Sequence, residues 1–344
     1  MARSRSTADS QTRSVGASRL PAGLNPEDLL EMYSTMVLVR TLDERIWLMN
    51  RQGKAAIVAS SQGHEAAQLG AVWAMRTAPS AAYFPYYRDL GMMIALGVSP
   101  LETMLGFMAK KGETFSGARQ FPLHGARPDL KLFNLSNVVS TQIPHAVGYA
   151  LGCKMSGDTT ITMTTFGDGG ASAGDFHEGM NFAAVHRLPI LFFCENNRYA
   201  ISVPMSQQMA IEDIADRAAG YGMPGVVVDG TDILATYQAT KEAVDRAIQG
   251  DGPTLIEAKV ERYLPHTSDD DDTRYRTKDE LEEARKHDPL KLLHDYLADE
   301  GILTNEVDRR FQEQAKTEVN QATDQAEAAP YPDPDDFLEH VYAS

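Results

Sequence analysis

The sequence contains little cysteine and no long apolar run. Its two cysteines, Cys153 and Cys194, both stand in apolar surroundings. They are therefore predicted to be buried packing residues and not a disulfide or a metal-binding pair. No stretch approaches the roughly 20 consecutive apolar residues that cross a bilayer, and no apolar signal-peptide core follows the N-terminus. These absences predict an intracellular protein that does not span a membrane.

A surplus of basic residues is also missing. Lys and Arg number 32 against 48 Asp and Glu, which gives a formal net charge of −16. Nucleic-acid binders need positive charge to neutralise phosphates, so this balance excludes that class. The 344 residues suffice for one large or two modest domains with a substantial core, and no internal repeat is present.

The N-terminal segment has a composition of its own. Residues 1–20 (MARSRSTADSQTRSVGASRL) are rich in serine and arginine and poor in acidic residues. This composition is typical of a disordered tail and also of an organellar transit peptide. We favour a flexible tail over residues 1–25, because the segment has no amphipathic apolar stripe.

Capping residues mark the starts of several helices. Asn25 and the residues Pro-Glu-Asp after it open a predicted helix over residues 26–51. Another helix is predicted to begin near His64. A third begins after Ser99, where Glu102 completes the Ser-x-x-Glu pattern of a capping box. Farther along, residues 278–321 are predicted to form charged helices.

Short apolar and β-branched runs predict buried strands with helices between them. The strands are predicted at residues 160–166, 188–194, 226–228 and 254–260, and the helices between them at 172–186 and 233–249. This alternation predicts an α/β fold with a doubly wound, mostly parallel sheet. Two segments without periodicity, 111–134 and 265–276, are predicted to be loops, the first of them near a site.

Polar residues follow the first two of these strands. Asp168 lies in a Gly-Asp-Gly turn after the first strand, and Asn197 follows the second. Open parallel sheets bind ligands at the carboxyl ends of their strands, so these two residues are expected to converge. With the main-chain oxygen of Tyr199, they offer the hard oxygen ligands that Mg²⁺ accepts beside phosphate oxygens. The amide-rich start of the helix predicted at Ser172 adds an anion site.

The two motifs and their spacing resemble a known signature. Gly-Asp-Gly at 167–169 and Asn-Asn at 196–197, with residues 170–195 between them, resemble the thiamine diphosphate motif. Further stretches extend the likeness over about residues 27–343. They are SSQGHEAAQLG (60–70), YFPYYRDLG (83–91), STQIPHAVG (140–148), FGDGGASAGDFHEGMNFAAV (166–185), FFCENNRYAISVP (192–204) and LPHTSDDDDTRYR (264–276). Together they resemble the α subunit of the 2-oxo acid dehydrogenase E1 component, in particular the branched-chain (2-oxoisovalerate) type.

This resemblance implies a fold and a set of site residues. The implied fold is a thiamine diphosphate-binding α/β domain at 26–265, an active-site loop at 266–276 and a helical extension at 277–344, with a further helical extension at the N-terminal end. The residues implied in cofactor binding are Tyr87, Arg88, Asn137, Val139, Gly167, Asp168, Gly169, Gly170, Asn197 and His266. His266 is also the implied catalytic residue, and Asp168, Asn197 and Tyr199 are the implied Mg²⁺ ligands.

Weaker assignments have alternatives. Ser136, Thr141 and Gln142 match part of a structural monovalent-cation site. Taken alone, Arg88 would form a surface ion pair with Asp89, and His266 would be a solvated loop residue beside an acidic run. Among the other histidines, His64 and His145 are expected to satisfy buried backbone groups, and His124 to line the substrate channel.

The function implied is decarboxylation of a 2-oxo acid, with reductive acylation of the lipoyl group of an E2 partner. A separate β subunit would supply the glutamate that activates the cofactor, in an α₂β₂ heterotetramer. Bacterial cytoplasm is the expected location, ahead of the mitochondrial matrix. The substrate pocket, with Ile57 and Tyr86 in its wall, is expected to prefer a branched-chain acid over pyruvate, with acetoin cleavage third.

Two interpretations from other classes remain. One is a catalytically silent scaffold subunit, which the complete set of Arg88, Asp168, Asn197 and His266 disfavours. The other is a nicotinamide-dependent dehydrogenase, but no early strand is followed by a G-x-G-x-x-G motif with an acidic residue about 20 positions later.

Overall fold

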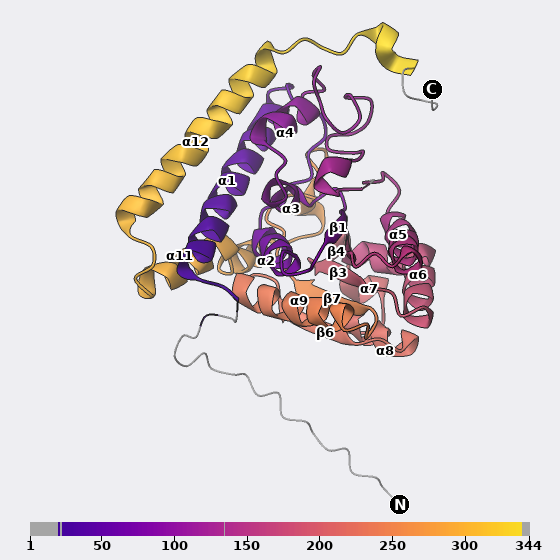
Figure 1. Cartoon of the computed structure of the whole chain (residues 1–344). Helices are drawn as coiled ribbons and strands as arrows, with labels where there is room; N and C mark the ends of the chain where they lie inside the picture. Colours follow the sequence, from indigo (N-terminus) through magenta and orange to yellow (C-terminus); the bar gives the residue numbers. More distant parts are fainter. Residues whose placement is uncertain (1–19, 21–22, 134, 339–344) are drawn as a thin grey trace, which may run out of the picture.

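The computed structural model describes residue 20, residues 23–133 and residues 135–338 (Figure 1). Most of the tail predicted at residues 1–25 therefore lies outside the described residues. At the centre is a five-stranded sheet in the order β1-β2-β3-β7-β6, in which each strand is parallel to its neighbours. The strands are β1 (Ala81–Phe84), β2 (Ile161–Gly167), β3 (Ile190–Asn196), β6 (Gly225–Asp229) and β7 (Thr254–Lys259). The predicted parallel α/β sheet is confirmed.

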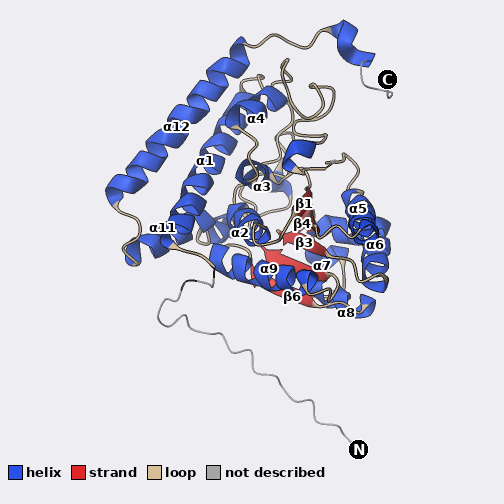
Figure 2. Cartoon of the chain, viewed as in Figure 1, coloured by secondary structure: helices blue, strands red, loops and turns tan. Residues whose placement is uncertain are grey.

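Helices cover both faces of this sheet (Figure 2). The α-helices of the described residues are α1 (Pro26–Arg51), α2 (Glu65–Met75), α3 (Leu90–Ala95), α4 (Pro100–Phe107), α5 (Gln142–Ser156), α6 (Gly174–Val185), α7 (Met205–Gln208), α8 (Ala218–Tyr221), α9 (Ile233–Ile248), α10 (Lys278–Arg285), α11 (Pro289–Asp299) and α12 (Asn305–Ala328). The predicted charged helices therefore continue to Ala328, beyond residue 321. None of the described helices combines the length and the apolar character that a membrane crossing requires.

The local signals for helix starts act as the sequence predicts. The side chain of Asn25 accepts a hydrogen bond from the Asp28 amide at 3.0 Å, and the Asp28 carboxylate accepts one from the Asn25 amide at 2.9 Å. Ser99 and Glu102 form the same reciprocal capping box at the start of α4. Each pair satisfies amides that have no partner inside the helix, so these starts are specified locally.

Alternate residues of the central strands face opposite layers of helices. On β3, Leu191 and Phe193 belong to the core shared with α1, α2 and α9, whereas Ile190, Phe192 and Cys194 belong to the core shared with α5 and α6. Side chains alternate across a strand, so a strand that is apolar throughout must be buried on both faces. Cys194 and Cys153 are both free and buried, as predicted.

The first and last long helices lie side by side at one end of the molecule (Figure 1). Buried Met32 and Met36 of α1 share a core with Ala315 and Val319 of α12. The Tyr33 hydroxyl of α1 also donates a hydrogen bond to an Asp308 carboxylate oxygen at 2.6 Å. The two terminal helical extensions therefore pack against each other and against the α/β core.

Candidate active site

A cavity of about 420 Å³ lies at the carboxyl ends of β2 and β3. Gly167 pairs with Glu195 across these strands, so Asp168 and Asn197 emerge at the same edge of the sheet. Both residues line the cavity. The other residues implied in cofactor or metal binding line it as well: Tyr87, Arg88, Asn137, Val139, Gly167, Gly169, Gly170, Tyr199 and His266. The structure therefore gathers segments far apart in the sequence around one space.

The turn after β2 differs from the prediction. Asp168–Ser172 forms a 3₁₀ turn, Ala173 is extended (φ −79°, ψ 152°), and α6 begins only at Gly174. The helix predicted at 172–186 is therefore confirmed, but its start lies at Gly174 and not at Ser172. Adjacent glycines have low α-helical propensity, and the extended residue separates α6 from the turn. The glycine-rich turn itself lines the cavity.

The glycines of this turn permit close packing. A Cβ atom at Gly169 would lie 2.8 Å from the Ala200 Cβ, and one at Gly170 would lie 2.9 Å from the Ser140 Oγ. The Ser140 hydroxyl donates a hydrogen bond to the Gly170 carbonyl at 2.8 Å. Side chains at these two positions would displace the turn, so the backbone beside Asp168 needs glycine for steric reasons.

Asp168 is a buried carboxylate without a counter-ion. Its exposed fraction is 1%, and the Gln208 amide donates to its Oδ2 at 2.9 Å. Among the described residues, no lysine, arginine or histidine forms an ion pair with it, and burial raises its pKa. Buried charges are normally paired or bound to a metal. The carboxylate therefore suits a bound cation.

The two adjacent asparagines have different partners. The Asn196 amide donates to a Glu257 carboxylate oxygen at 2.6 Å, on the side toward β7. Asn197 lines the cavity, and its Oδ1 accepts a hydrogen bond from the Tyr199 amide at 3.2 Å. A second lone pair of this oxygen remains for another partner. Of the two asparagines, only Asn197 lines the cavity.

Arg88 is buried and not on the surface. Its exposed fraction is 1%; Nη1 donates to the Ser60 carbonyl at 2.6 Å and Nη2 to the His266 carbonyl at 3.2 Å. Asp89 instead accepts from the Tyr86 amide and from Thr165, so the alternative of an ion pair between Arg88 and Asp89 is wrong. The Nε atom of Arg88 has no hydrogen-bond partner among the described residues, which leaves a buried donor for a ligand.

His266 is held in the cavity wall by the same arginine. Arg88 Nη2 lies 3.2 Å from Nδ1 of the His266 ring, and the Tyr87 ring stands edge-on to it at 5.8 Å. Burial, and then the positive charge of Arg88, lowers the pKa of His266 to about 3. The ring is therefore neutral near neutral pH. The alternative of a solvated loop histidine is wrong.

The acidic run after His266 is tied to the protein. Asp270 accepts hydrogen bonds from the His266 amide at 2.8 Å and from the Tyr275 hydroxyl. The Ser268 amide donates to the Val58 carbonyl at 2.8 Å, which joins the loop to the segment before α2. These contacts hold the loop at 266–276 against the rest of the chain, and its first two residues, His266 and Thr267, line the cavity.

Residues 33–335 match the sequence profile of the dehydrogenase E1 component family. The chain belongs to this family. It is 49% identical, over 93% of its own length and 97% of the relative's, to the 2-oxoisovalerate dehydrogenase subunit alpha of Bacillus subtilis. The resemblance to E1 α subunits, found in the motifs alone, is thereby confirmed.

Two other relatives in the E1 family are less similar. The 3-methyl-2-oxobutanoate dehydrogenase subunit alpha of Mycobacterium tuberculosis is 39% identical over 92% of this chain and 84% of its own length. The pyruvate dehydrogenase E1 component subunit alpha of Staphylococcus aureus is 40% identical over 88% of this chain and 79% of its own length. The E1 family depends on thiamine diphosphate.

Most of the other implied E1 residues, Ser136 and Gln142 included, also line the cavity. Asn137 and Val139 line the cavity, and Val139 is 57% exposed. In the cation site implied by the resemblance, Thr141 donates to the Val138 carbonyl and Gln142 to the Thr165 carbonyl. Occupancy of that cation site and the cofactor contacts of Asn137 and Val139 stay predictions.

The surroundings of the remaining histidines agree only in part with the prediction. His124 lines the cavity as expected. His145 is an exposed residue of α5. His64 is buried, but its Nδ1 lies 2.6 Å from a Glu195 carboxylate oxygen and not beside a backbone group. Sequence reasoning also missed Glu195, for which the only signal was a carboxylate directly after an apolar strand.

A small antiparallel ribbon beside the site was missed as well. It pairs β4 (Tyr199–Ala200) with β5 (Val203–Pro204). The chain enters it through Arg198 at a φ of 69°, a left-handed conformation that non-glycine residues rarely adopt. Two-residue strands are too short for an alternating apolar pattern, so the sequence carries no signal for them.

Proposed function

We propose that this chain is the α subunit of a thiamine diphosphate-dependent dehydrogenase of branched-chain 2-oxo acids such as 2-oxoisovalerate. The supporting observation is the set of buried groups around one cavity: a carboxylate without a counter-ion, Asp168, and an arginine with a free donor, Arg88. A magnesium diphosphate would complete both, since it brings a cation for the first and phosphate oxygens for the second.

The described residues fit this cofactor. Asp168, Asn197 and the main-chain oxygen of Tyr199 would hold Mg²⁺, which often takes one or two carboxylates with the remaining positions filled by phosphate and water. No group of three or more His, Cys, Asp or Glu suited to a metal occurs among the described residues, which disfavours a site built from protein side chains alone. Tyr87 and Arg88 would contact the diphosphate.

Bound thiamine diphosphate supplies the electron sink for decarboxylation, and the chain supplies orientation and a proton. Arg88 donates toward Nδ1 of His266, so the neutral ring carries its proton on Nε2. His266 can therefore donate a hydrogen bond from Nε2 to substrate or cofactor. Val139 offers an aliphatic support and Asn137 a polar contact at the cavity mouth.

The apolar part of the cavity favours a branched aliphatic substrate. The side chains that form it are Ile57, Tyr86, Phe107, Phe121, Pro122 and Ile201. Such a wall gains more from burying an isopropyl group than a methyl group, by about 0.8 kcal/mol for each carbon. The two relatives named for 2-oxoisovalerate and 3-methyl-2-oxobutanoate agree with this preference.

The site requires a second chain. Asp168 is the one carboxylate among the described residues that line the cavity, and it is assigned to the metal. The glutamate that activates the cofactor would therefore come from an E1 β subunit, in an α₂β₂ heterotetramer that delivers the acyl group to the lipoyl domain of E2. Exposed Val138, Val139 and Ile201 near the mouth provide apolar surface for such a subunit. The expected location is the bacterial cytoplasm.

Calorimetric titration of thiamine diphosphate into the chain co-expressed with its β-type partner tests the proposal. Binding should require Mg²⁺ and disappear in Asp168→Ala, and 2-oxoisovalerate should be turned over with a higher kcat/KM than pyruvate. A preference for pyruvate would overturn the substrate assignment. Absence of binding in the wild-type assembly would overturn the enzyme assignment and favour a scaffold subunit.

A further inference from the structure

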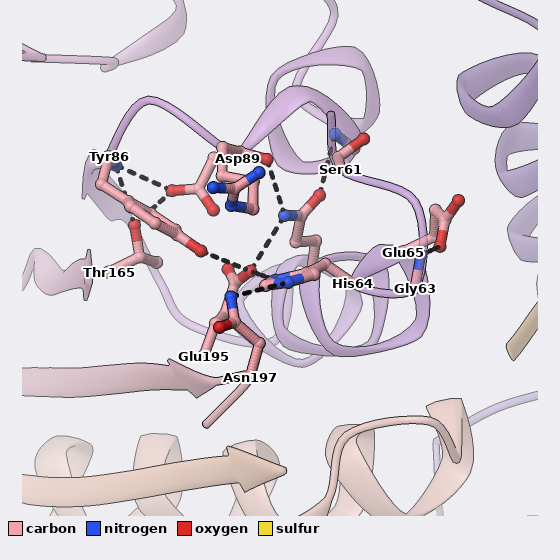
Figure 3. A network of polar contacts seen from close by, with 12 residues as sticks. Ser61, Gly63, His64, Glu65, Tyr86, Asp89, Thr165, Glu195 and Asn197 are labelled. Carbon is pink, nitrogen blue, oxygen red and sulfur yellow. Dashed lines mark hydrogen bonds and ion pairs between the residues drawn. The ribbon is translucent and has the colours of Figure 1, made fainter. Parts of the chain in front are cut away.

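A buried network of polar side chains lies beside Asn197 (Figure 3). It joins His64, at the start of α2, to Glu195 and Asn197, at the end of β3. His64 and Glu195 are completely buried, and neither lines the cavity. The network therefore reaches the cavity only through other residues, and its role must be sought in what it does to them.

Glu195 acts as the acceptor at the centre of this network. Its Oε2 accepts from the Gln68 amide nitrogen at 3.0 Å and from the Tyr86 hydroxyl at 3.1 Å. The orientation of the Gln68 amide is set independently, because its oxygen accepts from the Gly91 amide at 2.9 Å. Nδ1 of His64 lies 2.6 Å from the same Oε2, so with Glu195 as a carboxylate Nδ1 carries a hydrogen and donates it.

The other side of the His64 ring faces Asn197. Nε2 of His64 lies 3.4 Å from the Asn197 Nδ2, while the Asn197 Oδ1 accepts from the Tyr199 amide. An amide nitrogen can only donate, so Nε2 must be the acceptor. The hydrogen bonds to Glu195 and to Asn197 thus require the same neutral tautomer of His64, in which the one N–H hydrogen is on Nδ1.

We infer that His64 and Glu195 are positioning residues that hold the Asn197 amide with its oxygen available to the metal. This inference rests on the proposed function, in which Asn197 binds Mg²⁺. The amide has two orientations that differ by a half-turn. Only one gives the cation an oxygen, and the acceptor nitrogen of His64 selects it together with the Tyr199 amide, which donates to Oδ1. Outer partners of this kind orient metal ligands in many proteins.

The same carboxylate also connects the diphosphate end of the site. Gln68, which donates to Glu195, donates to the Arg88 carbonyl at 3.0 Å, and Tyr86 lies two residues before Arg88. Glu195 therefore ties the segment that carries Arg88 to the segment that carries Asn197. The spacing between the arginine and the metal ligand follows from this shared acceptor.

Two substitutions at His64 separate positioning from simple packing. The amide nitrogen of asparagine lies near the Nδ1 position of histidine, so His64→Asn keeps the donor to Glu195 and loses the acceptor for Asn197. Glutamine reaches the Nε2 position, so His64→Gln offers an oxygen to Asn197 and loses the donor to Glu195. His186→Asn, at an exposed histidine after α6, is the matched control.

The measurement is the Mn²⁺ dissociation constant by electron paramagnetic resonance, at saturating thiamine diphosphate in the assembly with the β subunit, beside the unfolding temperature. We expect His64→Asn to weaken Mn²⁺ binding about 10- to 100-fold while its unfolding temperature stays close to wild type. His64→Gln should bind Mn²⁺ within about 3-fold of wild type although it unfolds at a lower temperature, because Glu195 loses a donor.

The outcomes distinguish this inference from the proposed function. If wild type binds Mn²⁺ and His64→Asn binds it equally tightly, His64 has no positioning role and the function stands. If affinity simply follows the unfolding temperature in all variants, the role of His64 is packing. If wild type itself binds no Mn²⁺ with thiamine diphosphate, the proposed function fails. Should His64→Gln not assemble, His64→Asn still decides between the first two results.

Discussion

Two regions of the molecule can be compared: the helical layer formed by α1 and α12, and the edge of the sheet at the carboxyl ends of β2 and β3. Both are well packed, but they differ in whether their buried polar groups have partners. Between the helices, the buried contacts are made by residues such as Met32 and Val319, and Arg45 reaches Asn320 and Thr323 near the surface. At the sheet edge, Asp168 lacks a counter-ion and Arg88 Nε lacks an acceptor among the described residues.

The helical layer therefore contributes to stability, whereas the sheet edge contains polar groups that a ligand would pair. Burying an uncompensated polar group costs about 1–3 kcal/mol, so such groups persist only where they serve another purpose. The helical layer contains no feature that a ligand would complete. The sheet edge contains several such polar groups within one cavity. Substitutions at the edge should therefore mainly weaken ligand binding, and substitutions in the helical layer should mainly lower stability.

The largest contrast is expected at Asp168. Asp168→Asn should weaken binding of magnesium thiamine diphosphate by more than about 100-fold, because a metal ligand matters more than its outer partners. The same change should raise the free energy of unfolding of the cofactor-free chain by about 1–3 kcal/mol, since a buried charge disappears. Calorimetric titration and urea unfolding measure the two effects. A loss of stability would contradict the interpretation of Asp168 as an uncompensated charge.

The helical layer should respond in the reverse way. Met32→Ala, at a fully buried position of α1, should lower the free energy of unfolding by about 2–5 kcal/mol. Cofactor affinity of the folded protein should stay unchanged, since Met32 lies outside the cavity. Leu48→Ala on the same helix is the control: this side chain is 52% exposed and should cost less than about 1 kcal/mol. Equal losses at both positions would show that α1 is not packed as described.

Glycine substitutions sharpen the contrast further. Gly170→Ala places a methyl group 2.9 Å from the Ser140 Oγ and should cost about 1–3 kcal/mol, together with reduced cofactor affinity. Gly152→Ala on α5 meets no atom within 4 Å and should stabilise the chain by about 0.5–1 kcal/mol. Thermal unfolding of both variants checks the signs. A neutral Gly170→Ala would mean that the turn is free to shift.

The last effect, the smallest per unit of change, concerns pH. His266 has a pKa of 6.5 when unperturbed and about 3 in the fold, so the unfolded chain binds the extra proton between these values. Its contribution to stability is therefore complete above pH 6.5 and is lost as the pH falls toward 3. Comparing His266→Asn with wild type isolates this slope, at most about 1.4 kcal/mol per pH unit. Identical slopes would place His266 in solvent.

Much of the fold was predictable because its signals are local. The capping boxes at Asn25 and Ser99 act over three residues, and the apolar run that became β3 is buried on both faces as such runs must be. The start of α6 lies beyond the predicted Ser172, because Asp168–Ser172 forms a 3₁₀ turn and the extended Ala173 separates that turn from the helix.

The site, like the fold, was predictable where its signals are local. Asp168 and Asn197 could be placed at one edge, because parallel neighbouring strands bring their carboxyl ends together. The ion pair expected of Arg88 in isolation was wrong, since burial of an arginine depends on which loops fold over it. Nothing in the local pattern indicated that the acidic run would accept hydrogen bonds from His266 and Tyr275.

By itself, the sequence determined the alternation of strands and helices, the glycine turn with its carboxylate, and membership of the E1 family. The tertiary structure alone decided that Nδ1 of His64 meets Glu195, which is 131 residues away, and that Nε2 of the same ring meets Asn197. Helix caps and strand periodicity arise from contacts between near neighbours. The partners of a buried side chain arise from strand register and helix packing, which join distant segments.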